Sequence, residues 1–239
     1  MDSSRTELLT GIKGVELLKK ARVAVFGLGG VGSYAVEALA RAGVGSLLLV
    51  DHDRIEPSNL NRQLFALEST IGRAKTEIAV ERVGMINPEA EVDARSVYIG
   101  PDTIDGLFTP EFHYAIDAID TISSKVLLLS RFVAGGIPHV SCMGAANRLF
   151  YSNVMVADIG KTRHCPLARV VRKKLREMDI HSGVRCVYSE APVMAPGNGP
   201  EGTAVSQDGH ARGTISYLCG IMGLTAAAVI INDILAGVR

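Results

Sequence analysis

A glycine-rich turn is the first place in this chain where residue type and spacing suggest chemistry. Residues 25–43, VFGLGGVGSYAVEALARAG, run from an apolar stretch through clustered glycines into a helical pattern. Glycines let the backbone approach a phosphate closely, and a helix N-terminus offers free N–H groups and a positive dipole end. The turn predicts a nucleotide site, although tight helix–strand packing would also explain it; its candidate contacts are Gly27, Gly29, Gly30, Gly32 and Ser33.

The residues after this turn distinguish between possible nucleotides. Asp51 ends the next apolar run, where a carboxylate can bind ribose hydroxyls. A helix end can bind a pyrophosphate, whereas a triphosphate carries about four charges and needs Arg or Lys beside its outer phosphates. Suitable polar side chains follow at Asn59, Arg62, Gln63 and Lys75.

A second carboxylate, Asp120, ends a further apolar run, and a carboxylate beside a triphosphate can hold Mg²⁺. Structural roles remain open for these charges: Arg62 could pair with Glu68, and Asp120 could cap the following helix. Taken together in this order, the charged residues favour ATP and Mg²⁺ over NAD.

The elements that position these residues alternate between strand-like and helix-like periods. Such alternation predicts parallel βαβ units and an α/β fold with a Rossmann-like, doubly wound, mostly parallel sheet. Strands are expected at 22–26, 46–50, 91–99, 113–119 and 138–142, and helices at 31–42, 73–86, 101–107 and 123–134.

The C-terminal part is less regular and is expected to extend the same sheet within one domain, 1–239. It predicts an antiparallel strand within 150–159, a helix at 166–178, a strand at 184–189 and a mobile Gly- and Pro-rich loop at 191–213. The apolar run 215–233 predicts a buried core helix, with peripheral membrane contact as the alternative.

Composition limits the cellular setting and the partners. The formal net charge is zero, so the overall charge does not indicate a polyanionic partner. The four cysteines form no C-x-x-C pair, which leaves neither a zinc signature nor a disulfide framework. We therefore expect a cytoplasmic protein without zinc.

Several motifs resemble the adenylating enzymes related to ubiquitin-activating enzyme. They are GLGGVGS (27–33), VDHD (50–53), SNLNRQ (58–63), IGRAK (71–75), INP (86–88) and DAID (117–120). Within that superfamily, RTELLTG (5–11), SCMGAAN (141–147), residues 156–177 and VYSEAP (187–192) resemble the branch that dehydrates threonylcarbamoyladenosine in tRNA. The similarity covers nearly the whole chain.

The resemblance implies a role for each matching position. Asp51 would bind ribose, while Asn59, Arg62 and Lys75 would hold the triphosphate and Asp120 would hold magnesium. In relatives an N-terminal arginine reaches the γ-phosphate of the neighbouring subunit, and Arg5 stands at about that place, which implies a homodimer. Adenylation of the threonyl carboxylate, followed by ring closure and loss of AMP, would need no catalytic cysteine.

A tRNA partner requires a positive surface, and one segment after residue 160 is strongly basic. On the helix at 166–178, apolar residues at helical spacing predict a buried face and leave the basic residues on the other side. A solvated helix face is the alternative interpretation. The candidate tRNA contacts are Lys161, Arg163, Arg169, Arg172 and Lys173.

Three rival functions remain open at this point. An NAD-dependent oxidoreductase would use the same glycine turn but would give Arg62, Lys75 and Asp120 no shared purpose. Adenylation of the C-terminus of a ubiquitin-like sulfur-carrier protein would use the same chemistry. A non-catalytic scaffold would instead bind a partner protein of a sulfur-relay complex.

Overall fold

The computed structural model contains one sheet of seven strands and describes residues 1–108, 111–194 and 213–236. The strand order is β3-β2-β1-β4-β5-β7-β6, and every neighbouring pair is parallel except β6 and β7. The predicted doubly wound sheet with an antiparallel extension is therefore confirmed. The strands are β1 (Arg22–Phe26), β2 (Ser46–Val50), β3 (Glu91–Arg95), β4 (Tyr114–Asp117), β5 (His139–Cys142), β6 (Val154–Asp158) and β7 (Arg185–Ser189).

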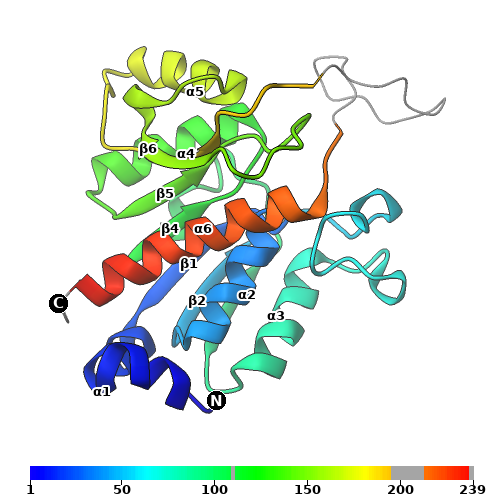
Figure 1. The fold of residues 1–239 in the computed structure, drawn as a ribbon, viewed down its shortest axis with the longest axis vertical. Helices are drawn as coiled ribbons and strands as arrows, with labels where there is room; N and C mark the ends of the chain where they lie inside the picture. The colour runs from blue at the N-terminus through cyan, green and yellow to red at the C-terminus, as the bar shows by residue number, and fades with distance from the viewer. Residues whose placement is uncertain (109–110, 195–212, 237–239) are drawn as a thin grey trace.

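Helices cover both faces of this sheet (Figure 1). One apolar core contains Leu39 of α2, Ile78 of α3 and Ile230 of α6, whereas the other contains Leu128 of α4 and Val171 of α5. Alternating strands and helices thus bury both faces, as parallel sheets require. The helices are α1 (Ser4–Lys20), α2 (Gly32–Ala42), α3 (Lys75–Ile86), α4 (Ile122–Ala134), α5 (Pro166–Arg176) and α6 (Ser216–Leu235).

Some elements differ from the sequence expectations. The strands at 91–99 and 113–119 are shorter than predicted, and 101–107 forms turns that lead into the 3₁₀ helix Asp105–Phe108. Helix α1 was not predicted. It breaks at Gly11, where φ is +70°, and leaves Leu8 and Leu9 more than four-fifths exposed, so its apolar residues follow no single buried stripe.

Helix α6 is long and apolar enough to cross a membrane, but half of its most apolar stretch is buried inside the protein. It lies against α2 and the sheet (Figure 1), with Leu218, Met222 and Ile230 fully buried. This placement agrees with the predicted core helix, and membrane contact stays a prediction. Most of the expected loop at 191–213 lies outside the described residues.

Candidate functional site

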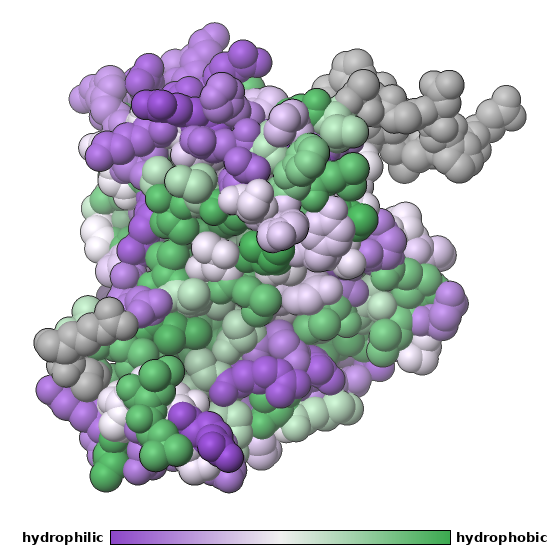
Figure 2. All heavy atoms as spheres, viewed as in Figure 1, coloured by the Kyte–Doolittle hydropathy of each residue, from purple (hydrophilic) through white to green (hydrophobic). Residues whose placement is uncertain are grey.

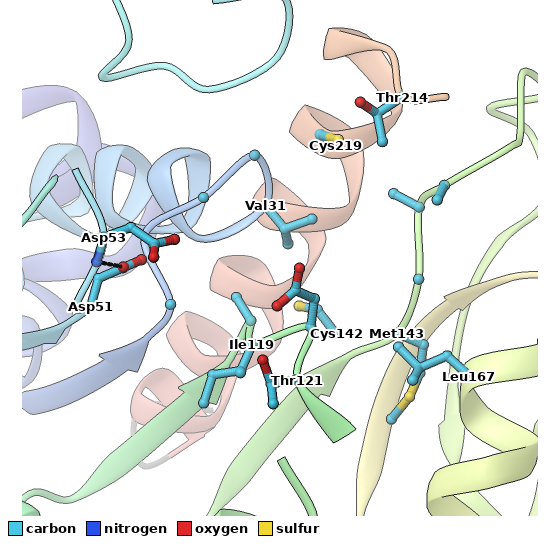
Figure 3. Close-up of a pocket in the computed structure, with 18 of the residues that line it drawn as sticks. Val31, Asp51, Asp53, Ile119, Thr121, Cys142, Met143, Leu167, Thr214 and Cys219 are labelled. Atoms are coloured by element: carbon cyan, nitrogen blue, oxygen red, sulfur yellow. Dashed lines mark hydrogen bonds between the residues drawn. The ribbon is translucent and has the colours of Figure 1, made fainter. Parts of the chain in front are cut away.

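A pocket of about 740 Å³ lies at the carboxyl ends of the central strands, the edge where open α/β sheets bind ligands. Figure 3 shows Asp51 and Asp53 on one side of it, Met143 and Leu167 on the other, and Val31 and Ile119 between them. The pocket brings together nine of the predicted site residues: Gly27, Gly29, Gly30, Asp51, Asn59, Arg62, Gln63, Lys75 and Asp120.

The glycine turn shapes one end of the pocket. Gly27 has a φ of +89°, and a Cβ on it would lie 2.8 Å from the carbonyl oxygen of Ala118. Gly32 and Ser33 lie outside the lining. A Cβ on Gly32 would lie 1.8 Å from the Gly27 oxygen, and the buried Ser33 hydroxyl accepts a hydrogen bond from the Leu64 N–H at 3.1 Å. Both residues therefore hold the turn rather than face the cavity.

Asp51 joins the end of β2 to this turn. Its Oδ2 accepts a hydrogen bond from the Leu28 N–H at 2.6 Å, and its Oδ1 accepts one from the Asp53 N–H at 2.8 Å. A carboxylate offers about four lone-pair sites, so these bonds leave acceptor capacity for a ribose hydroxyl. The buried carboxylate is thus fixed at the place expected from the sequence.

Lys75 begins α3 and lies buried behind the acidic residues. Its Nζ is 2.6 Å from Asp53 Oδ2 and 4.0 Å from Asp51 Oδ1. Asp51, His52 and Asp53 also place one potential metal-ligand atom each within 4.8 Å of one another. Lys75 neutralises part of the negative charge of these carboxylates, and the carboxylates hold its ammonium group in place. A phosphate that approaches Lys75 therefore meets a cation that is already positioned.

The loop between β2 and α3 carries the remaining predicted phosphate contacts. Arg62 Nη1 donates to the Ser58 carbonyl at 2.6 Å and to Asn61 Oδ1 at 3.0 Å. The alternative pairing of Arg62 with Glu68 does not occur among the described residues. Gln63 Oε1 is buried without a hydrogen-bond partner in the described part of the chain, which leaves an acceptor that a bound ligand could satisfy.

Asp120 is exposed at the pocket. Beside it lies a buried charged network that is not predicted from the sequence. The Lys125 Nζ donates to Asp117 Oδ2 at 2.6 Å and to the Cys142 carbonyl at 3.0 Å. Asp117 Oδ1 accepts a hydrogen bond from the Ile119 N–H at 3.1 Å. The network therefore fixes the turn that carries Asp120. The sequence signal that could have revealed this network is a lysine, Lys125, inside the mostly apolar helix α4.

The other end of the pocket is mostly apolar and includes Met143, Leu167 and Val170. Arg148 and the buried Cys165 also lie there. Burial raises the pKa of the Cys142 thiol to about 12 and raises that of Cys219. Protonated thiols are poor nucleophiles, so neither cysteine is suited to covalent catalysis.

Two predicted groups lie outside the pocket. Arg5 is exposed on α1 and does not contribute to the lining in its own chain. Of the basic candidates, Lys161, Arg163, Arg169 and Lys173 are exposed.

Arg172 differs from the other basic candidates because it is half-buried. Its Nη1 donates to the carbonyls of Ile159 and Thr162, each at 3.1 Å. The predicted buried face of the segment 166–178 forms only in part, since Ala168, Val171 and Leu175 are buried while Val170 and Met178 are exposed.

Comparisons with known proteins agree with this geometry. The chain matches the ThiF family over residues 4–237. It is 46% identical over 192 residues to tRNA threonylcarbamoyladenosine dehydratase of Bacillus subtilis, covering 80% of this chain and 76% of the relative. The relative of the same name from Escherichia coli is 34% identical over 232 residues, covering 94% and 85%.

A solved structure shows the same arrangement of elements. The crystal structure of the Escherichia coli tRNA N6-threonylcarbamoyladenosine dehydratase in complex with ATP matches with a TM-score of 0.88 and 32% identity. The match covers 98% of this chain and 93% of that one. The chain therefore belongs to the ThiF family, and within it to the tRNA threonylcarbamoyladenosine dehydratases.

Proposed function

We propose that this protein uses ATP to dehydrate threonylcarbamoyladenosine in tRNA to its cyclic form. The observation that carries the proposal is the meeting of a glycine turn, the buried Asp51 carboxylate, the cations Arg62 and Lys75 and the exposed Asp120 carboxylate in one pocket. The relatives reported above, one of them solved with ATP, support the same conclusion. An NAD site would leave Arg62, Lys75 and Asp120 without a common role.

The reaction removes one water in two steps. A carboxylate oxygen of the threonyl group attacks the α-phosphorus of ATP, the bond to the β-phosphate breaks, and pyrophosphate leaves. A nucleophile of the same modified side chain then attacks the acyl carbon, loses its proton and expels AMP, which retains the oxygen of the lost water. Because this nucleophile is already tethered, proximity replaces a covalent enzyme intermediate.

In this mechanism the two cations act on the phosphates. Arg62 can donate two parallel hydrogen bonds to phosphate oxygens, and Lys75 supplies a buried point charge. Asp51 holds the ribose, and Asn59 and Gln63 supply side-chain amides at the same end of the pocket. The two cations together stabilise the negative charge that develops on the leaving pyrophosphate.

Mg²⁺ fits the donor chemistry of this site. The Asp120 carboxylate is exposed at the pocket, and among the described residues it accepts no hydrogen bond from the N–H groups at the start of α4. Carboxylate oxygens together with substrate phosphates are the usual ligands of Mg²⁺. Bound there, Mg²⁺ would neutralise phosphate charge during adenylation.

The partner that delivers the substrate is a tRNA. Helix α5 presents Arg169 and Lys173 to solvent, and hydrophilic side chains crowd over α5 at the top of Figure 2. Leu167 and Val170 of the same helix line the pocket. Phosphate contacts made by the basic side would therefore bring a neighbouring nucleotide to the pocket mouth.

A homodimer would complete the site. Apolar side chains gather over α1 and along α6 in Figure 2, and Leu8, Leu9, Tyr217 and Leu224 are exposed there. Exposed apolar patches of this kind mark protein interfaces. Arg5 lies on the same helix α1, so we propose that a second copy covers this face and contributes its Arg5 to the γ-phosphate.

Mass spectrometry of tRNA nucleosides after incubation with protein, ATP and Mg²⁺ tests the function. We expect threonylcarbamoyladenosine to lose one water, and we expect no loss without ATP. Pyrophosphate exchange that a ubiquitin-like sulfur-carrier protein stimulates, and that modified tRNA does not, would instead support the carrier-protein alternative. Binding to a sulfur-relay protein with neither reaction would support the scaffold.

A further inference from the structure

Arg148 is a buried cation that has no carboxylate partner in the part of the chain that the structure describes. The residue is 3% exposed, yet it contributes to the lining of the pocket. Its guanidinium donates to two neutral acceptors, the Ala191 carbonyl and, at 2.7 Å, the His164 carbonyl. Among the described residues, no Asp or Glu forms an ion pair with it or contributes to its electrostatic surroundings.

A charge in this position is costly unless a ligand compensates it. Burial lowers the pKa of Arg148, and the neighbouring Cys165 thiol acts in the opposite direction. The backbone carbonyls satisfy part of the hydrogen-bonding capacity of the guanidinium, but they carry no net charge. Buried cations in proteins are usually paired, so a buried cation in a pocket that no described carboxylate pairs with indicates a missing anion.

The position of Arg148 indicates which anion is missing. The groups suited to ATP, namely the glycine turn, Asp51 and Lys75, lie at one end of the pocket. Arg148 lies in the segment after β5, which continues from Met143 at the other end (Figure 3). The buried Met143 and the partly buried Leu167 line the pocket there, and an apolar surrounding strengthens any ion pair that forms.

We propose that Arg148 binds the threonyl carboxylate of the substrate and holds it for attack on the α-phosphate. The proposal rests on the proposed function, because that function supplies a substrate with a carboxylate. A planar guanidinium fixed by two backbone carbonyls can offer its remaining N–H groups to both oxygens of a carboxylate. Arg148 is then a specificity-determining residue that distinguishes modified from unmodified tRNA.

The test compares two tRNAs and two variants. Wild-type protein should bind tRNA bearing threonylcarbamoyladenosine more tightly than the same tRNA transcribed without the modification. Arg148→Gln should weaken binding of the modified tRNA about tenfold to hundredfold, the range of a lost charge-assisted hydrogen bond, and leave the unmodified tRNA unchanged. Arg148→Lys keeps the charge without the planar fork, so its loss should be smaller.

Lys173→Gln is the matched control for charge. It removes one exposed cation outside the pocket, so any loss of affinity should be equal for the two tRNAs. Affinity for ATP and the melting temperature should stay close to wild type in both Arg148 variants. If Arg148→Gln does not fold because the Ala191 and His164 carbonyls lose their donors, Arg148→Lys decides the question.

A test without mutation uses the free modified nucleoside and its methyl ester, which lacks the carboxylate charge. Only the free acid should compete with modified tRNA for the wild-type protein. Equal competition by both, or unchanged discrimination between the tRNAs by both Arg148 variants, would overturn the proposal. If wild-type protein with ATP and Mg²⁺ removes no water from threonylcarbamoyladenosine in tRNA, the proposed function fails instead, and the two failures are thereby distinguished.

Discussion

At the scale of single residues, Arg62 and Lys75 differ in how easily their roles can be tested. Lys75 is buried against Asp53 and Asp51, so its removal also leaves carboxylates uncompensated. Arg62 is half-buried and, within the described ranges, donates only to Ser58 and Asn61 of its own loop. A loss of activity in an Arg62 variant is therefore easier to assign to the missing phosphate contact.

We predict that Arg62→Ala lowers the adenylation rate by about 10²–10³-fold, the usual effect of removing one charged donor from a developing anion. Pyrophosphate exchange in the presence of modified tRNA measures this rate, and thermal unfolding serves as the control for the fold. Near-normal exchange by Arg62→Ala would show that the triphosphate does not lie against this loop.

The cysteines give a prediction about pH. Since burial raises the pKa of Cys142 to about 12 and raises that of Cys219, both thiols stay protonated from neutral pH up to the raised pKa. The activity should therefore show no rise with pH that follows ionisation of Cys142 or Cys219 between about pH 7 and 9. Iodoacetamide should alkylate Cys142 and Cys219 only after unfolding. Rapid alkylation of either thiol in the folded protein, with loss of activity, would contradict the assignment.

At the scale of elements, the Lys125–Asp117 pair connects α4 with β4 and β5 beneath the site. Both side chains are fully buried, so removing one partner leaves an uncompensated charge. We predict that Lys125→Met lowers the free energy of unfolding by about 3–5 kcal/mol. Adding Asp117→Asn should recover part of that loss, and denaturant titration of the single and double variants measures it. A double variant less stable than Lys125→Met would refute this explanation.

Helix α5 carries the prediction for tRNA. Arg172 is engaged with the carbonyls of Ile159 and Thr162, so the exposed Arg169 and Lys173 are the appropriate residues to change. Their joint replacement by Glu should raise KM for tRNA and leave KM for ATP unchanged. The slope of log affinity against log salt should also fall by about one for each phosphate that the variant no longer binds. An unchanged slope would indicate a solvated helix face.

The elements also show what the sequence could and could not predict. Apolar runs such as those of β1 and β2 are short, continuous and followed by glycine or Asp, so their positions were predicted closely. Helix α1 was not predicted because Gly11 interrupts it and because exposed apolar residues in its first half, such as Leu8 and Leu9, obscure the helical pattern of buried residues. The Lys125–Asp117 pair and the burial of Arg148 depend on contacts between segments distant in the chain, which local patterns do not encode.

At the scale of the whole molecule, Arg5 and the pocket are separated within one chain. Arg5 lies on α1, which Figure 1 places at the end of the molecule opposite the loops around the site. If Arg5 acts on the γ-phosphate, it must come from a second copy. Loss of activity in Arg5→Ala alone would not distinguish this role from a structural one.

Mixing two inactive variants makes that distinction. Arg5→Ala keeps a complete pocket, and Lys75→Ala keeps Arg5, so a mixed dimer contains one site with both groups. We predict that combining the two variants under conditions that exchange subunits restores dehydration that neither shows alone. Light scattering should report dimers before and after exchange. If mixed dimers form without recovery of activity, Arg5 does not act across the interface, and the exposed side of α1 then serves only as a contact surface.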